Sequence, residues 1–217
     1  MLRRFLNLIY PPKCVLCQRI LDSNVTDLCH SCRINAREFT HGKRNIPFVA
    51  QWTALWYYKD DVRSSIHRFK FRNRRKYAES YARLLAMHME KEGFADWDVA
   101  TWIPIGPWRN FRRGYDQAQL ICQNLQKETG CQIRRFLKKI RNAPPQSGLA
   151  DAARRRANVL GAYKAVNPAL LEGKRILLLD DVITTGATAS ECARILLTAG
   201  AKSVTLAAVA AARQDKI

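Results

Sequence analysis

The sequence predicts an α/β fold, in which a parallel sheet flanked by helices follows a small four-cysteine module. Three observations carry this prediction. Short aliphatic runs alternate with helical patterns from residue 99 onward, one run (176–179) is wholly aliphatic, and two Cys-x2-Cys pairs lie near the N-terminus. Strands that alternate with helices form parallel sheets, because each helix returns the chain to the start of the next strand. A chain of 217 residues is long enough for one sizeable core and a small appendage.

The N-terminal segment, residues 1–47, is predicted to be a small metal-binding module. It contains two cysteine pairs, whose members are Cys14, Cys17, Cys29 and Cys32. Four thiolates suffice for one tetrahedral zinc ion, and a site closed in this way has a structural role. The spacing leaves an iron–sulfur centre and a redox pair open as alternatives. The polar stretch 40–47 ends in proline and is predicted to link this module to a second domain at 48–217.

An aromatic, β-prone stretch at 50–58 predicts the first strand of the second domain, with a turn at 59–61. The segment 63–76 then holds seven basic residues and no acid. Aromatic side chains among arginines are typical of a groove for single-stranded nucleic acid. The alternative is an amphipathic segment whose Ile66, Phe69 and Phe71 pack inward while the basic side chains flank an anion site. Residues 77–92 have the apolar spacing of a helix.

Residues 99–103 are predicted to begin the main sheet, and a Pro-Gly turn with Ile105 and Gly106 follows them. Because glycine lets the backbone approach a ligand closely, this turn is a candidate anion site. Three arginines supply positive charge beside it: Arg109, Arg112 and Arg113. The alternative is that these arginines coat the start of a helix.

A helix is predicted from 116 or 117 to 128, and residues 133–140 are predicted to form another strand of the sheet. The stretch 141–156 is polar and basic, and it is predicted to close over a bound ligand and exclude water. Several cations in this region are candidates to neutralise a departing anion. They are Lys138, Lys139, Arg141, Arg154, Arg155 and Arg156.

The stretch 175–189, RILLLDDVITTGATA, carries the clearest chemical pattern. Its aliphatic run predicts a fully buried strand, which ends at two adjacent acids, Asp180 and Asp181. A run of small residues then leads into a predicted helix: Thr184, Thr185, Gly186, Ala187 and Thr188. The N–H groups at a helix start hold phosphate, whereas carboxylates accept hydrogen bonds from sugar hydroxyls. The stretch therefore predicts a site for a ribose 5-phosphate, and a last strand is predicted at 203–209.

This stretch resembles the phosphoribosyl pyrophosphate (PRPP) signature of the type I phosphoribosyltransferases. In that superfamily the acids hold the ribose hydroxyls and the loop holds the 5-phosphate. The four cysteines, together with HRFKFRNRRKYA, WIPIGPWRNFRRGYDQAQL and PQSGLADAARRRANVLGAY, make nearly the whole chain resemble the ComF family, which includes GntX-like proteins. The family usually has Phe-Asn where Tyr115 and Asp116 stand here.

The resemblance implies a type I phosphoribosyltransferase-like domain that binds PRPP with Mg²⁺ and transfers ribose 5-phosphate to a nitrogen acceptor. It implies catalytic roles for Asp180, Asp181, Lys139 and Arg141, and it places pyrophosphate on Ile105, Gly106, Arg112 and Arg113. It also implies a link to competence and DNA uptake. The alternative is a non-catalytic DNA-uptake protein that binds single-stranded DNA or a competence helicase, with a vestigial or regulatory PRPP site.

The charge balance indicates polyanionic partners. The chain has 37 basic and 18 acidic residues, a net charge of +19, which favours phosphorylated small molecules or nucleic acid over a merely solvated basic face. No apolar run approaches the ~20 residues of a membrane span. The apolar patch at 5–10 is shorter than the ~7–15 residues of a signal-peptide core. We therefore expect a cytoplasmic protein, and the sequence leaves a homo-oligomer open.

Overall fold

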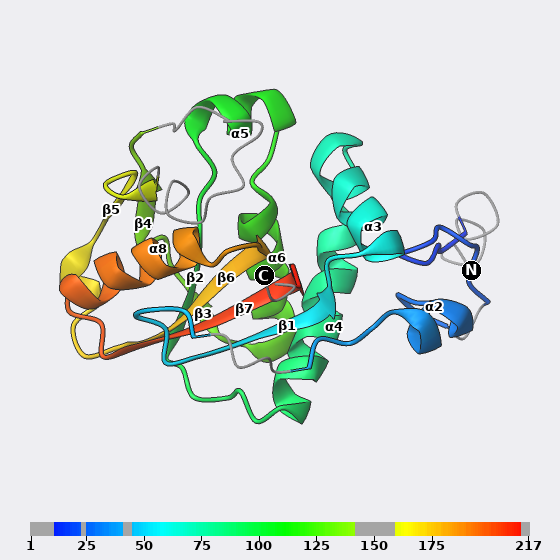
Figure 1. Cartoon of the computed structure of the whole chain (residues 1–217), viewed down its shortest axis with the longest axis horizontal. Helices are drawn as coiled ribbons and strands as arrows, with labels where there is room; N and C mark the ends of the chain where they lie inside the picture. Colours follow the sequence, from blue (N-terminus) through cyan, green and yellow to red (C-terminus); the bar gives the residue numbers. More distant parts are fainter. Residues whose placement is uncertain (1–10, 23–24, 41–44, 142–158, 214–217) are drawn as a thin grey trace.

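The computed structural model describes residues 11–22, 25–40, 45–141 and 159–213 (Figure 1). A five-stranded, all-parallel sheet forms its centre, in the order β1-β7-β6-β2-β3. The strands are β1 (Gln51–Tyr57), β2 (Val99–Trp102), β3 (Gln132–Ile133), β6 (Arg175–Ile183) and β7 (Ser203–Ala211). The predicted parallel sheet is therefore confirmed. The long central strand, β6, lies between β7 and β2, so its aliphatic run is buried on both faces.

Helices cover both faces of this sheet. On one face lie α3 (Asp60–Phe71), α4 (Tyr77–Lys91) and α6 (Gln117–Thr129), and on the other lies α8 (Ala187–Thr198). The predicted spacing holds in α4, where Tyr81, Leu85 and Met89 recur every four residues and are almost fully buried. Helix α6 ends where Gly130 adopts a left-handed conformation with φ of 70°.

Three expectations from the sequence are wrong in detail. Residues 59–61 are not a turn between elements, because α3 begins at Asp60, where acidic side chains are stabilised by the helix dipole. Phe71 does not pack inward with Ile66 and Phe69, since its side chain is 57% exposed at the last residue of α3.

The third error concerns residues 133–140, which do not form one strand. Only β3 joins the main sheet, and a second strand, β4 (Leu137–Lys139), pairs antiparallel with β5 (Tyr163–Ala165) in a separate two-stranded sheet. The break occurs at two exposed arginines, after which Phe136 and Leu137 are both buried. Phe136 and Leu137 pack into the hydrophobic cluster that also contains the inner face of α8, and the Phe136 carbonyl accepts a hydrogen bond from the Val166 N–H just after β5, so the chain leaves the main sheet here.

The N-terminal module packs against α3 and α4. Its short helix, α2 (His30–Asn35), and its cysteines belong to the same hydrophobic cluster as the inner faces of these helices. Arg83 of α4 makes an ion pair with the buried Asp27, with Nε 2.9 Å from Oδ2. Figure 1 shows α3 between this module and the sheet. No helix among the described residues has the length and apolar character needed to span a membrane.

Two short elements connect these layers. Helix α5 (Pro107–Arg113) follows the turn after β2, and none of its residues is buried. The 3₁₀ turn η1 (Pro168–Leu170) precedes β6. The carboxyl ends of β2 and β6 are neighbours, because Trp102 pairs with Leu179. The two loops singled out in the sequence therefore leave the same edge of the sheet.

Candidate functional site

Two adjacent carboxylates lie near the carboxyl end of β6. Asp180 Oδ1 accepts a hydrogen bond of 2.8 Å from the Asp181 N–H, and the two side chains point to opposite faces of the strand. Burial raises the pKa of the Asp180 carboxyl, and the charge of Asp181 adds to the rise, while the positive charge of Lys70 opposes it. The ionised form of Asp180 is thus disfavoured unless hydroxyl donors or a cation reach it.

Asp181 is buried and has a cationic partner. Its Oδ1 lies 2.7 Å from the ammonium of Lys70, the residue before the last in α3. The side chains of Lys70 and Asp181 are 19% and 13% exposed, so water screens this pair only in part. Among the described residues, no hydrogen bond or ion pair engages Oδ2 of either aspartate. Each carboxylate therefore keeps one oxygen for a ligand.

The loop after β6 leads directly into α8. Gly186 precedes the helix with φ of 79°, a left-handed conformation that favours glycine. Gly186 has no side chain with which to cap the helix, and the first turn contains no acid, while the Thr185 hydroxyl accepts a hydrogen bond of 3.4 Å from the Ala187 N–H. Thr184 is exposed and Thr185 is half-buried, so the loop is open to solvent at the N-terminus of a twelve-residue helix. Backbone N–H groups, hydroxyls and the helix dipole all favour an anion there.

The turn after β2 is fixed by an internal carboxylate. The Ile105 N–H donates to Asp116 Oδ2 at 2.9 Å, and the Gln119 N–H donates to Asp116 Oδ1 at 3.2 Å. Asp116 is buried, which raises the pKa of its carboxyl, although both N–H bonds oppose that shift. Gly106, the second predicted anion contact, is the residue before α5.

The arginines of α5 differ in their surroundings. Arg113 is half-buried, donates to Gln117 Oε1 at 2.8 Å, and lies with its guanidinium 4.9 Å from the centre of the Phe71 ring. Burial lowers the pKa of Arg113, and the charge of Asp181 opposes that shift. Arg109 and Arg112 are exposed. Arg113 thus packs on Phe71, the neighbour of the Lys70 that pairs with Asp181, whereas Arg112 lies at the surface.

The cations that were predicted to neutralise a departing anion also differ in how far they are buried. Lys139, at the end of β4, is half-buried, and its ammonium lies 5.1 Å from the centre of the Tyr163 ring. Burial lowers the pKa of Lys139, the charge of Arg109 adds to this, and the charge of Asp180 opposes it. Arg141 is exposed and donates to the Leu160 carbonyl at 2.8 Å. Lys138 is exposed in the middle of β4. Arg154, Arg155 and Arg156 lie outside the described residues.

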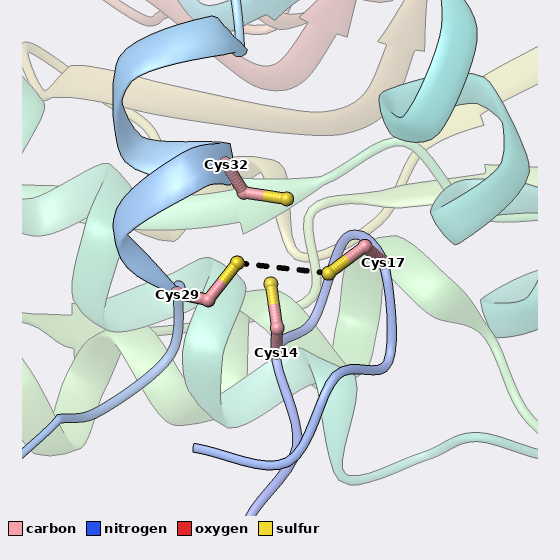
Figure 2. A group of neighbouring side chains, drawn as sticks. All are labelled: Cys14, Cys17, Cys29 and Cys32. Carbon is pink, nitrogen blue, oxygen red and sulfur yellow. Dashed lines mark hydrogen bonds between the residues drawn. The ribbon is translucent and has the colours of Figure 1, made fainter. Parts of the chain in front are cut away.

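Figure 2 shows the four cysteines of the N-terminal module converging on one point. Their sulfur atoms all lie within 4.8 Å of one another, and Cys17 Sγ is 3.6 Å from Cys29 Sγ. Four sulfurs at ~2.3 Å from one zinc ion would be about 3.8 Å apart, so the cluster fits a tetrahedral site. A hydrogen bond from the Cys32 backbone lowers the pKa of the Cys29 thiol, which favours the thiolate form that binds zinc. This geometry supports a structural zinc site.

Sequence reasoning did not single out Lys70 or assign a role to Asp116. Lys70 was one of seven basic residues in a single run, although it lies four residues after the inward-facing Ile66 and hence near the same helix face. Asp116 immediately precedes a helix, a position where a carboxylate caps N–H groups, and this was the available signal.

The sequence matches two described families. A phosphoribosyl transferase domain covers residues 113–217, and a double zinc ribbon domain covers residues 5–43. The first contains the acids and the threonine-rich loop, and the second contains all four cysteines. The fold and site thus define a phosphoribosyltransferase-like protein with an N-terminal zinc ribbon.

Curated relatives are similar over most of the chain. DNA utilization protein YhgH of Escherichia coli O157:H7 is 30% identical over 203 residues, which cover 88% of this chain and 86% of the relative. Competence protein F of Haemophilus influenzae is 26% identical over 215 residues, which cover 88% of this chain and 93% of the relative. The chain belongs to the ComF family, whose members are linked to competence and DNA utilization. The resemblance inferred from the sequence is therefore confirmed.

Among solved structures, the glutamine PRPP amidotransferase of B. subtilis in complex with ADP and GMP aligns with a TM-score of 0.41 and 24% identity. The alignment covers 60% of this chain and 26% of the amidotransferase chain. The family assignment rests on the sequence matches and not on this structural likeness.

Proposed function

We propose that this protein binds Mg²⁺ and PRPP at the carboxyl edge of the sheet and transfers ribose 5-phosphate to a nitrogen acceptor. One observation carries the proposal: two carboxylates of β6, whose Oδ2 atoms have no partner among the described residues, are separated only by residues 182–186 from the start of α8. A ribose 5-phosphate needs hydroxyl acceptors and an anion site side by side, and β6 with its loop supplies both. A second anion site at the neighbouring β2 turn suits the pyrophosphate.

Each group has a role in the proposed reaction. Asp180 and Asp181 accept hydrogen bonds from the ribose hydroxyls, and residues 184–188 hold the 5-phosphate. Mg²⁺, when bound with PRPP, would stabilise negative charge on the pyrophosphate. The bond from ribose C1 to pyrophosphate breaks, a bond from C1 to the acceptor nitrogen forms, and the nitrogen loses a proton.

The cations that would face the leaving group are Arg113, which lies over the Phe71 ring, and Lys139, which lies over the Tyr163 ring. Both are partly withdrawn from water, which strengthens their attraction for the charge that develops on the departing pyrophosphate. Such a reaction relies on positioning and electrostatic stabilisation, so it needs no side-chain nucleophile.

The test is calorimetric titration of Mg-PRPP into the native protein and into the double variant Asp180→Asn/Asp181→Asn. We expect the native protein to bind and the variant to lose at least about 100-fold in affinity, because both sugar contacts are charged hydrogen bonds. The matched control is Asp96→Asn/Asp98→Asn, which removes equal charge near Arg175 at the opposite end of β6. Pyrophosphate release is then measured with a panel of bases and amines. Release identifies an enzyme, whereas binding without release identifies a protein that only binds PRPP. A native protein without affinity for PRPP would contradict the proposal.

A basic cavity favours a second candidate function, the binding of single-stranded DNA. It lies on the outward face of α3 and in the turn that follows, and has a volume of about 820 Å³. Four arginines line it, Arg63, Arg68, Arg72 and Arg74, together with His67 and the acidic Asp60, and Tyr58 adds an aromatic ring. A concave, arginine-lined surface with an aromatic side chain suits a phosphodiester backbone and its bases.

The test is the salt dependence of binding to a labelled DNA oligonucleotide. We expect the variant Arg63→Glu/Arg72→Glu/Arg74→Glu to lose most of its affinity. The slope of log K against log salt should become shallower by about 0.7 for each phosphate that the variant no longer neutralises. The control is Lys174→Glu/Lys202→Glu, two exposed lysines before β6 and β7. If both variants lose affinity equally, binding is non-specific and this candidate is wrong.

A further inference from the structure

Helix α3 connects the zinc module to the acidic pair. Near its middle, the Ser65 hydroxyl donates to the Val15 carbonyl, and the Arg68 guanidinium donates to the Leu16 carbonyl. Val15 and Leu16 are the two residues between Cys14 and Cys17, and both are almost fully buried. Because a bound zinc would fix this four-residue turn, it would also fix the acceptors that hold α3. Figure 1 shows the helix between the module and the sheet.

The last turn of α3 is held from the other side as well. The Tyr115 hydroxyl donates to the Phe69 carbonyl, one of the helix-terminal carbonyls that lack a partner within the helix. The Phe71 ring lies under the Arg113 guanidinium, and Phe69 itself is fully buried. Lys70 stands between these two anchored residues, and its ammonium reaches Asp181 Oδ1 at 2.7 Å. The backbone that carries Lys70 is thus fixed on both sides of the residue.

We propose that Lys70 is a positioning residue for the sugar site, an inference that rests on the proposed function. It engages Oδ1 of Asp181 and so leaves Oδ2 directed to a ribose hydroxyl. It also compensates one negative charge at a place where two carboxylates would repel the polyanionic PRPP. Through α3, the zinc turn determines where this ammonium stands.

The proposal leads to a specific dependence on Mg²⁺. Without the ammonium, Asp181 has no cationic partner among the described residues, and a divalent cation would have to compensate the acidic pair before PRPP can bind. The variant Lys70→Gln should therefore bind PRPP about tenfold more weakly at submillimolar Mg²⁺, and excess Mg²⁺ should restore most of the affinity. A residue that served only folding would not change the dependence on Mg²⁺.

The experiment compares four proteins by calorimetry across a Mg²⁺ series: native, Lys70→Gln, Lys70→Arg and Lys127→Gln. Lys70→Arg retains the charge and should restore native affinity at low Mg²⁺ to within about threefold. Lys127→Gln is the matched control, because Lys127 is an exposed lysine in the last turn of α6, where its only described partner is Asn124. It should bind PRPP as the native protein does.

Thermal unfolding without ligand gives an independent readout. The loss of melting temperature from Lys70→Gln should be smaller in an Asp181→Asn background, because the pair is already broken there. Equal losses in both backgrounds, or native-like Mg²⁺ dependence in Lys70→Gln, would overturn the role of Lys70 and leave the proposed function intact. A native protein that binds no PRPP would instead overturn the proposed function, and the sugar-site role of Lys70 with it.

Discussion

Removal of zinc is expected to lower the free energy of unfolding by at least about 3 kcal/mol, or roughly 6–12 °C in melting temperature for a chain of this size. The N-terminal module has little core of its own, so the metal closes its fold. Its buried residues also complete the hydrophobic cluster against which α3 and α4 pack. The loss should therefore extend beyond the module to the Ser65 and Arg68 contacts with the zinc turn.

Elemental analysis of the purified protein and thermal unfolding with and without a strong chelator test this prediction. The variant Cys32→Ser should reproduce the effect of the chelator, since Cys32 is a buried member of the cluster. Cys131→Ser is the control, because Cys131 is a half-buried cysteine outside the cluster. A native protein without zinc, or a Cys32→Ser variant as stable as Cys131→Ser, would exclude a structural metal.

The second large effect is expected from Gly186→Ala. The residue adopts φ of 79°, where a side chain costs about 1–2 kcal/mol, and it immediately precedes the first N–H groups of α8. Relief of that strain would shift the loop that is proposed to receive the 5-phosphate. We expect the affinity for ribose 5-phosphate and PRPP to fall at least about tenfold, because the N–H groups at the start of α8 would be displaced.

The variant Gly173→Ala is the control that distinguishes the effect of backbone strain on stability from an effect on ligand binding. Gly173 also has a positive φ, of 66°, and a Cβ built there meets no atom within 4 Å. Both variants should lose similar stability in denaturant unfolding, but only Gly186→Ala should lose ligand affinity in calorimetry. If Gly186→Ala binds as tightly as Gly173→Ala, the phosphate does not lie at this helix start.

The parts of the fold that depend on local sequence patterns could be predicted from the sequence. The aliphatic run 176–179 predicted the central strand, although β6 continues past the acids because Asp180, Val182 and Ile183 still pair with β7. The two Cys-x2-Cys pairs predicted that the four cysteines lie together, since a tetrahedral zinc ion needs four ligands. The roles of the individual site residues stay predictions.

Pairings across long separations could not be predicted in this way. Lys70 and Asp181 are 111 residues apart, and nothing in a basic run marks which cation will face the sheet. The hydrogen bond between Ile105 and Asp116 likewise depends on how β2 and α6 meet. The end of β3 also depends on long-range packing, because Phe136 and Leu137 join the cluster around α8, where β4 pairs with β5.

The bond from the Ile105 N–H to Asp116 has a consequence for the kinetics of recognition. Asp116 anchors the β2 turn and the start of α6 together, so the turn keeps its shape before any ligand arrives. A preshaped turn avoids the entropic penalty of ordering it during association. Encounter with a phosphorylated sugar should then resemble docking to a rigid surface, with an on-rate governed by diffusion and by the positive charge of the chain.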